Sequence, residues 1–360
     1  MQSNIYIFGA HSRGRTLKAY INYLYPESIV EAFIVDNYDD NETEVDGIPV
    51  KKIGQWMNVE LPVYIATRGV YHEKIIQQLC ALGVKTTILV TVELDMQLRN
   101  RYVHEFYERN RRKFVKIQDL PVMLNQECKS KFFSACIYAA TSVHDSILQD
   151  KYDLKVYEKR IQVGAALTDQ RLENAAYDDS GDNISEKNRQ YCELTGLYWV
   201  WKHATEDYVG LCHYRRHFIL PDHWVERMEQ NSIDVILPVP LYVAPNLEDN
   251  FRGRHAAIEW DCMMQYLQSK LPEDYERARE FFQGNLYSPC NMLIASRQVL
   301  DELCKWLFPI LDAVVKECGT EEDKYENRYP GFLSERLITY YFESKRQQYK
   351  IAYADKNFLK

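Results

Sequence analysis

Short apolar runs alternate with amphipathic helical patterns along the first third of the chain, and this alternation constrains the fold more than any other feature. The run at residues 4–8 is rich in β-branched and aromatic residues, and a glycine turn separates it from a helical pattern at residues 17–24. We expect further strands at residues 30–35, 63–66 and 86–90, and a further helix at residues 72–82. Strands that alternate with helices in this way pair in parallel. Residues 1–92 are therefore predicted to form a doubly wound parallel sheet.

The glycine turn after the first strand is suited to a phosphate. It places backbone N–H groups and a helix N-terminus at the carboxyl edge of the sheet, the edge that binds nucleotides in Rossmann-like folds. Asp36 ends the second strand about 20 residues further on, where an acid can hold a ribose hydroxyl. The candidate nucleotide-binding residues of this domain are Gly9, Ser12, Gly14, Arg15 and Asp36.

The dinucleotide fingerprint in this turn is incomplete, because His11 stands where its second glycine would be. A side chain at that position crowds a pyrophosphate and disfavours NAD. Two interpretations are open. The turn binds a nucleotide or nucleotide-sugar, or Gly9 and Gly14 serve only the turn and the close packing of the helix.

Charge and cysteine usage exclude several classes of protein. The net charge is −8 and the isoelectric point about 5.7, opposite to the basic excess of a general nucleic-acid binder. The longest apolar stretch, near residues 306–315, is about half the roughly 20 residues of a membrane span, and no leader-like segment begins the chain. Nine cysteines without a C-x-x-C pair fit reduced thiols. We therefore expect a cytoplasmic protein without a transmembrane segment or a signal peptide.

A charged segment at residues 93–130 is expected to be a helical connector. Its basic face is either simply solvated or docks near anionic lipid or an acidic partner. A second domain is expected over residues 131–360, with strands at residues 132–140, 156–163, 207–212 and 233–237. A helix is expected at residues 191–201. The last 120 residues are expected to be mostly helical, with an isolated strand at residues 292–295.

The densest polar segment of the chain lies at residues 178–188. Carboxylates, amides and a hydroxyl in a glycine-containing loop can hold sugar hydroxyls, a ribose or a cation, whereas a helix cap needs only one or two such residues. The candidate ligands here are Asp179, Asp182, Asn183 and Asn188.

A basic tetrad, His213-Tyr214-Arg215-Arg216, follows a buried strand. Ligands of α/β sheets bind at that edge, and arginines there can stabilise a departing diphosphate. Because adjacent residues of a strand point to opposite faces, we expect only one arginine to face the ligand. The alternative is a surface salt-bridge site.

A third cluster follows the helix breakers Pro330 and Gly331. Glu335 is a candidate general base or sugar-hydroxyl ligand, and Arg336 is a candidate phosphate cation. The alternative is a charged pair on a solvated helix.

The first domain resembles the small N-terminal domain of bacterial sugar O-acyltransferases. The resemblance rests on Phe33-Ile34-Val35-Asp36-Asn37, on residues 45–50 and on residues 62–66, and covers roughly residues 4–92. It implies a domain that binds a nucleotide-sugar. No β-helix hexapeptide repeat follows, so the acyltransferase half is not expected.

The second domain resembles the bacterial glycosyltransferase family of capsular and exopolysaccharide biosynthesis, which includes enzymes similar to galactofuranosyltransferases. The resemblance covers about residues 131–345 and rests on several motifs in order: residues 181–188, 191–195, 198–202, 209–216, 234–238 and 331–337, and Asn291-Met292. It implies a GT-A-like α/β domain with a helical C-terminal part and a nucleotide-sugar donor. His144 fits the family's strand-end histidine, although Asp145 stands where a lysine often follows. His255 and Asp261 match loosely the family's His and Asp near the acceptor.

The sequence thus predicts a glycosyltransferase that acts on a glycan or lipid-linked glycan, in the cytoplasm and peripherally at the inner membrane face. Glu335, Asp261 or Asp182 would accept the proton, and Arg215, Arg216 and Arg336 would stabilise the diphosphate. Either these arginines replace a metal, or Asp179 and Asp182 hold Mg²⁺ or Mn²⁺. Two alternatives are a sugar-phosphate transferase of capsule synthesis and a non-catalytic nucleotide-sugar sensor or scaffold.

Overall fold

The computed structural model describes residues 4–38, 41–123 and 133–360, and it confirms an α/β fold. The chain divides into two compact units. The first comprises residues 1–113 with 242–244, and the second comprises residues 114–241 with 245–360. This division falls inside the segment expected to be a connector, residues 93–130. The expected boundary between residues 130 and 131 lies outside the described residues.

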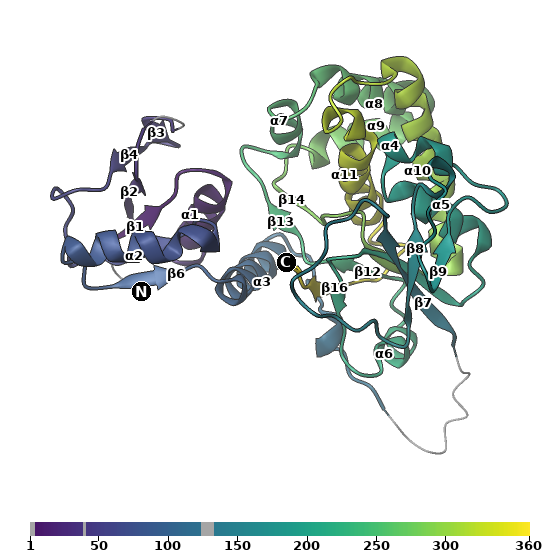
Figure 1. The fold of residues 1–360 in the computed structure, drawn as a ribbon, viewed down its shortest axis with the longest axis horizontal. Helices are drawn as coiled ribbons and strands as arrows, with labels where there is room; N and C mark the ends of the chain where they lie inside the picture. Colours follow the sequence, from purple (N-terminus) through teal and green to yellow (C-terminus); the bar gives the residue numbers. More distant parts are fainter. Residues whose placement is uncertain (1–3, 39–40, 124–132) are drawn as a thin grey trace. The chain divides into compact units, whose positions relative to one another are not determined.

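The first unit is built on the expected parallel sheet, drawn in purple and blue in Figure 1. Its strand order is β3-β4-β2-β1-β5-β6. The strands are β1 (Ile5–Phe8), β2 (Val30–Val35), β3 (Glu44–Val45), β4 (Ile48–Lys52), β5 (Val63–Ile65) and β6 (Thr87–Leu89). All neighbours pair in parallel except the hairpin of β3 and β4, whose turn residues Asp46 and Gly47 both have positive φ. That backbone matches the twist of a tight hairpin.

Three helices complete the first unit: α1 (Ser12–Leu24), α2 (His72–Ala81) and α3 (Val92–Arg109). Helix α1 packs on α3 through the rings of Tyr20, Tyr23 and Tyr102, with centroids 4.8–5.1 Å apart. Helix α1 also approaches strand β1 closely, since a Cβ on Gly14 would lie 1.9 Å from the carbonyl oxygen of Gly9. Only glycine fits there, so Gly14 has a packing role.

The second unit contains an eight-stranded mixed sheet with the order β11-β16-β12-β15-β10-β7-β8-β9. The strands are β7 (Ala135–Thr141), β8 (Glu158–Gln162), β9 (Ala175–Tyr177), β10 (Tyr208–His213), β11 (Phe218–Ile219), β12 (Val235–Pro238), β15 (Leu293–Ser296) and β16 (Ile351–Lys356). Strands β7 to β10 are parallel, as are β12 and β16, and β15 runs antiparallel between β10 and β12. The ends of β7, β9, β10 and β16 and the start of β15 therefore share one edge.

Three local expectations for this unit are wrong. The strand expected to be isolated, at residues 292–295, is central, because its register depends on partners about 60–90 residues away that local sequence cannot reveal. Strand β16 (Ile351–Lys356) was not expected at all. The helix expected at residues 191–201 is interrupted at Cys192, whose φ of 50° ends α4 (Asn188–Tyr191) before α5 (Leu194–His203) begins.

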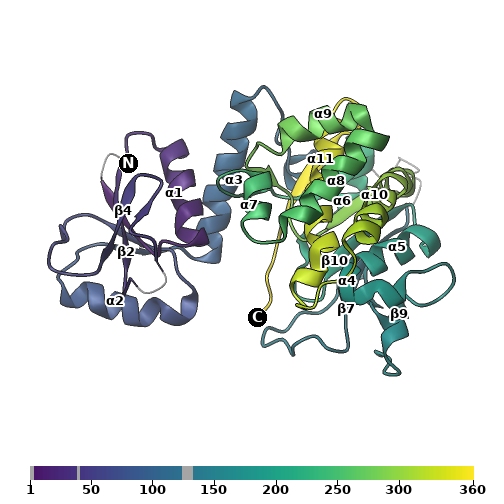
Figure 2. The ribbon, with the colours of Figure 1, turned by 90° about the horizontal axis from the view of Figure 1, so that it is seen from above.

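Helices cover both faces of this sheet. Strand β10 directs Leu211 to one face, where α5 lies against it, and Tyr208 and Cys212 to the other, where they share a core with Trp224 of α6 (Trp224–Gln230). Figures 1 and 2 both show α8 (Ala257–Lys270), α9 (Pro272–Phe281), α10 (Arg297–Cys318) and α11 (Tyr329–Ser344) gathered together. The remaining elements are α7 (Leu247–Arg252) and the short strands β13 (Leu241–Tyr242) and β14 (Leu286–Tyr287). Within the described ranges, we find no helix with the length and apolarity that crossing a bilayer requires.

A carboxyl group is buried without a hydrogen-bond partner in this helical layer. Glu259, in the first turn of α8, is 0% exposed, and neither of its carboxyl oxygens is paired. Burial, with smaller contributions from Glu321 and Glu326, raises the pKa of Glu259 to about 8. The folded protein therefore holds a proton that the unfolded chain releases above its ordinary pKa of 4.5.

We expect Glu259→Gln to remove a pH-dependent loss of stability. Between about pH 5 and 8 the folded state binds more protons than the unfolded state, so wild-type stability falls as pH rises. The variant should gain about 2–4 kcal/mol over wild type at pH 8 and much less at pH 5. Urea unfolding across this range measures the difference. Glu276→Gln, at an exposed pair with Arg279, is the control and should follow wild type. Parallel pH curves for Glu259→Gln and wild type would contradict the assignment.

Candidate active site

The basic tetrad forms a tight turn at the shared edge of the second sheet. Strand β10 ends at His213, and the backbone groups of His213 and Arg216 bond reciprocally, N to O, at 3.0 and 3.1 Å. Tyr214 and Arg215 therefore form the tip of the turn rather than a continued strand. The expectation that the two arginines point to opposite faces is wrong, because both guanidinium groups lie 5.2–5.3 Å from the one ring of Phe358.

His213 is held as a neutral, oriented imidazole. Its Nε2 donates to the carbonyl oxygen of Cys290 at 2.6 Å and lies 3.7 Å from a carboxylate oxygen of Glu193. Burial lowers the pKa of His213, and the charge of Arg216 lowers it further against the opposing charge of Glu193. A neutral imidazole with a hydrogen on Nε2 satisfies the carbonyl.

The segment that precedes β15 joins three parts of this site. Cys290 and Asn291 have φ of 75° and 51°, a left-handed conformation uncommon outside glycine. The buried amide of Asn291 donates to Glu193 at 2.8 Å and to the carbonyl of Gly331 at 3.0 Å, and it accepts from Ser334 at 2.6 Å. The strained backbone thus fixes Glu193 and the start of α11 against the end of β10.

Glu335 is a carboxyl with a strongly perturbed pKa. Its carboxylate accepts a hydrogen bond from the backbone N–H of Cys290 at 2.5 Å, and its side chain is 17% exposed. Burial raises the pKa of Glu335 to about 7, with Arg336, the Cys290 N–H and Arg216 opposing and Glu193 adding to the shift. A carboxyl that titrates near neutrality beside cations is suited to general-base catalysis.

Arg336 does not reach outward from this cluster. It is 3% exposed, donates to the carbonyl of Phe332 and to Asn250, and lies over the rings of Phe251 and Tyr287. The expected direct contact with a donor phosphate is not supported, because the guanidinium is enclosed by protein. Its charge acts instead on Glu335, 4.0 Å away.

Two site residues escaped the sequence analysis. Glu193 lies within the motif at residues 191–195, and its pairing with His213 arises only in the fold. Lys356 ends the unexpected strand β16; burial raises the pKa of the Cys290 thiol to about 11 while the charge of Lys356 opposes that rise, and the same charge adds to the lowering of the pKa of His213. The cluster of Glu193, His213, Arg215, Arg216, Asn291, Glu335 and Lys356 is hereafter called the edge cluster.

The acidic loop at residues 178–188 uses its side chains locally. Asp179 pairs with Arg171 at 2.8 Å, and Asp182 pairs with Lys202 at 3.2 Å and accepts from Tyr198 at 3.0 Å. Asn183 bonds Gly181 and Ser185, and Asn188 bonds the Cys192 carbonyl and Thr195. Strand β9, which precedes this loop, is three strands from β10, or about 14 Å at ordinary strand spacing.

These contacts therefore do not bring the acidic loop face to face with the tetrad, as one shared donor pocket would require. Asp182 is also a poor general base, because hydrogen bonds from Lys202 and Tyr198 lower its pKa. Asp179 and Asp182 engage different cations, so the geometry does not favour them as a shared metal site.

His144 and Asp261 lie in different surroundings. His144 is exposed in the loop after β7, beside Asp145. Burial raises the pKa of Asp145 while the nearby charge of Arg215 opposes the shift, so this loop borders the tetrad. Asp261 is 56% exposed on α8 and pairs with Arg252 at 2.6 Å. Asp261 is thus engaged with Arg252, and its expected role as a base gains no support.

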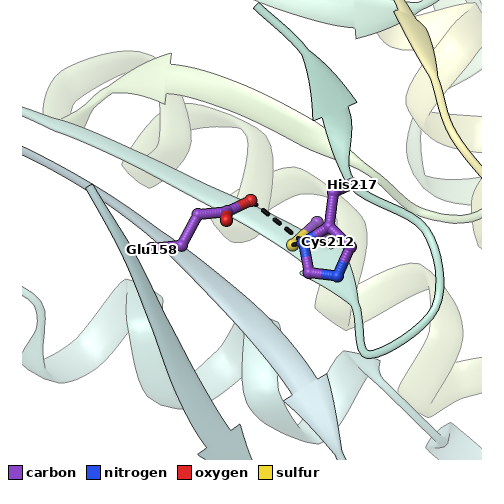
Figure 3. A group of neighbouring side chains, drawn as sticks. All are labelled: Glu158, Cys212 and His217. Atoms are coloured by element: carbon purple, nitrogen blue, oxygen red, sulfur yellow. Dashed lines mark hydrogen bonds and ion pairs between the residues drawn. The ribbon is translucent and has the colours of Figure 1, made fainter. Parts of the chain in front are cut away.

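One group of described side chains converges closely enough to be considered for a metal ion: Glu158, Cys212 and His217 (Figure 3). His217 Nδ1 lies 3.0 Å from Glu158 Oε1 and 3.7 Å from Cys212 Sγ. All three side chains are buried. Cys212 directly precedes the tetrad, His217 directly follows it, and Glu158 begins strand β8.

The N-terminal candidates surround the carboxyl edge of the first sheet. Gly9 has φ of 108°, and Gly14 packs on it, in accord with the packing interpretation of these glycines. Arg15 bonds the Ala10 carbonyl and Glu42, and Ser12 begins α1. Asp36 Oδ2 lies 3.4 Å from Lys74, while its Oδ1 is buried without a partner, as is the hydroxyl of Thr67.

Comparisons with known proteins place the second unit. Residues 140–347 match the family model described as a domain of unknown function, DUF4422. No curated protein matches the chain. The structure titled WbbM bifunctional glycosyltransferase, in its apo form, is 25% identical with a TM-score of 0.55. The match covers 62% of this chain and 45% of WbbM, so this chain spans less than half of that protein.

The mannosyltransferase Ktr4p from S. cerevisiae is 11% identical over 68% of this chain and 75% of its own, but its TM-score of 0.33 carries no argument. The family model covers more than half of the chain. The chain therefore belongs to the DUF4422 family.

Proposed function

We propose that this protein is a glycosyltransferase that moves a sugar from a nucleotide-sugar donor to a glycan acceptor. The observation that carries the proposal is the edge cluster, in which the carboxyl of Glu335, with a pKa near 7, lies beside Arg216 at the ligand-binding edge of an α/β sheet, and the charges of Arg216 and Lys356 both act on the neighbouring Cys290. The likeness of the second unit to part of WbbM supports the same class of reaction.

The chemistry follows from the charges of the edge cluster. An acceptor hydroxyl attacks the anomeric carbon of the donor and transfers its proton to the carboxylate of Glu335. The bond between that carbon and the diphosphate oxygen breaks, and the nucleoside diphosphate leaves. Arg215, Arg216 and Lys356 stabilise the growing negative charge on the leaving oxygens. His213 and Glu193 hold the cluster in register through Cys290 and Asn291.

Three narrower statements belong to the same proposal. The sugar is a hexose, the product belongs to a capsular polysaccharide, exopolysaccharide or O-antigen, and the enzyme works in the cytoplasm at the inner membrane face. The GT-A-like fold resemblance and the polysaccharide-biosynthesis motifs support them. The cations of the tetrad can neutralise a diphosphate without a metal. Assays with and without Mg²⁺ or Mn²⁺ determine separately whether the reaction requires a metal ion.

A donor panel tests the proposal directly. Wild type incubated with UDP-, GDP- and dTDP-sugars, with and without Mn²⁺, should release nucleotide from at least one donor. Arg216→Ala should lower kcat/KM for that donor by about 10²-fold, because it removes a cation aimed at the leaving group. Arg279→Ala, at an exposed pair on α9, is the matched control. Neither release nor binding of any donor by wild type would contradict the proposal.

The pH profile tests Glu335 as the base. With a pKa of about 7, its carboxylate form increases as pH rises, so kcat/KM should rise through pH 7 and level off above it. Glu335→Gln should lose this limb and about 10²–10⁴-fold of activity. Steady-state nucleotide release from pH 5.5 to 9 measures both. An unchanged profile in the variant would assign the base elsewhere.

The two alternative functions give different products. A sugar-phosphate transferase would use the same cations but leave a phosphate in its product, which mass spectrometry of the product detects. A non-catalytic sensor would release no nucleotide and would be indifferent to Arg216→Ala.

A second candidate function belongs to the first unit. We infer a nucleotide or nucleotide-sugar site at the carboxyl edge of its sheet, formed by Gly9, Ser12, Gly14, Arg15 and Asp36. The supporting observation is that Asp36 Oδ1 and Thr67 Oγ1 are buried and unpaired after β2 and β5, the two neighbours of β1. A ribose hydroxyl could satisfy such acceptors.

Calorimetric titration of the full chain with UDP and UDP-sugars tests this second site. Asp36→Ala should weaken one class of binding at least tenfold, about 1.4 kcal/mol or more, and leave nucleotide release unchanged. Glu60→Ala, at the exposed pair with Lys85, is the control. Identical titrations of Asp36→Ala and wild type would refute the site.

A further inference from the structure

The buried group of Glu158, Cys212 and His217 forms a saturated hydrogen-bond network (Figure 3). The side chains of Glu158 and His217 are each 1% exposed. Glu158 Oε2 accepts from the Tyr152 hydroxyl at 3.0 Å and from the backbone N–H of Lys155 at 2.9 Å. Glu158 Oε1 faces His217 Nδ1 at 3.0 Å, and the Tyr152 ring stacks on the imidazole at 4.0 Å. Every polar atom of the pair therefore has a partner.

The partners of His217 determine its protons. Nε2 lies 3.2 Å from the carbonyl oxygen of Tyr214, which can only accept, so this nitrogen carries a hydrogen. Nδ1 faces a carboxylate oxygen, which also accepts when ionised. The two donors on Oε2 favour the ionised carboxylate. Burial opposes this ionisation, but the hydrogen bonds from His217 and Lys155 outweigh burial and keep the pKa of Glu158 below its ordinary value. An ionised Glu158 with both nitrogens of His217 donating satisfies every one of these contacts.

The same contacts argue against a metal ion. A metal on Nδ1 would have to replace the contact between Nδ1 and Glu158 Oε1, while Oε2 is already engaged by Tyr152 and the backbone N–H of Lys155. A structural zinc site has four ligands, and among the described residues three converge here.

His217 also bonds the turn that carries the two half-buried arginines. The Nε2–H of His217 donates to the carbonyl of Tyr214 at the tip of that turn, and the backbone N–H of His217 donates to Asn357 Oδ1 at 2.7 Å. The backbone N–H of Leu359 in turn donates to the carbonyl of Arg215 at 2.9 Å. Strand β8, through Glu158, is thereby tied to Tyr214, Arg215 and Arg216.

We propose that the buried Glu158–His217 ion pair is the positioning element of the tetrad turn, and that it fixes Arg215 and Arg216 for an anionic ligand. The identification of the anionic ligand as a diphosphate rests on the proposed function. The doubly protonated His217 and its bond to the turn are independent of that function. Glu158 and His217 are positioning residues, because they act through Tyr214 and touch no substrate.

The first arm of the test needs no substrate. In ¹⁵N-histidine-labelled full-length protein, His217 is assigned by its loss in His217→Asn. We expect both of its nitrogens to carry protons near neutral pH. In Glu158→Gln the ring should keep Nε2–H, which the Tyr214 carbonyl requires, and lose the proton on Nδ1, because a neutral amide N–H at position 158 can donate to Nδ1 and no longer stabilises an imidazolium. A nitrogen without a proton in wild type, or one mole of zinc per chain by elemental analysis, would overturn the proposal.

Amide hydrogen exchange reads the turn itself. Glu158→Gln should speed exchange of the Arg216 N–H, which bonds His213, by at least tenfold, with amides of α6 as the internal reference. A uniform increase across both segments would reduce the pair to a general stability element and overturn the positioning role.

The second arm uses the donor found by the panel. Glu158→Gln should raise KM for that donor at least fivefold and keep kcat within about threefold of wild type. The rise of kcat/KM through pH 7, assigned to Glu335, should remain. His217→Gln should lie closer to wild type than His217→Asn, because its amide can still reach the Tyr214 carbonyl. His223→Asn, at an exposed pair with Glu226, is the matched control. Unchanged KM in folded Glu158→Gln would refute the role, and a wild type without any donor would refute the proposed function alone.

Discussion

The site depends on one buried amide, that of Asn291. Its oxygen and nitrogen join three segments that lie far apart in sequence: the residue before α5, the loop before β15 and the first turns of α11. A buried amide with all of these bonds satisfied has few alternative arrangements, since losing any one leaves a polar group unpaired in a low-dielectric interior. The left-handed backbone at Cys290 and Asn291 is tolerated because these bonds determine it. Glu335 receives its N–H donor from the same strained segment.

Burial separates the charges of the site into two kinds. Arg336 is enclosed by Phe251 and Tyr287 and acts by holding down the pKa of its neighbour Glu335. Arg215 and Arg216 lie on a turn, beside a half-exposed Phe358, and remain available to a ligand. The buried Arg336 shifts the pKa of Glu335, whereas Arg215 and Arg216 are placed where they can contact a phosphate. In its proposed positioning role the Glu158–His217 pair completes the arrangement, because His217 bonds the Tyr214 carbonyl in the turn that carries these arginines.

The two units differ in how far local sequence predicted them. In the first unit, the strands and helices follow each other in a regular order, so hydrophobic periodicity predicted the parallel sheet and the place of Gly9, Gly14 and Asp36 at its edge. Only the hairpin of β3 and β4 was missed, because its two strands are short. In the second unit, β15 and β16 come more than 70 residues after the strands at the other end of the sheet, and nothing local specifies their pairing. Lys356 was missed for the same reason.

By itself, the sequence determined the α/β class, the polar motifs and the likeness to polysaccharide glycosyltransferases, because these depend on local patterns of apolar and charged residues. It also indicated Glu335, Arg215 and Arg216. Only the tertiary structure decided which motifs meet: the acidic loop ends at an outer strand and satisfies its own charges, while Glu193 and Asn291 lie between the tetrad and α11. The physical reason is that a side chain's role depends on its burial and on its partners, and both are set by long-range strand pairing that local sequence does not contain.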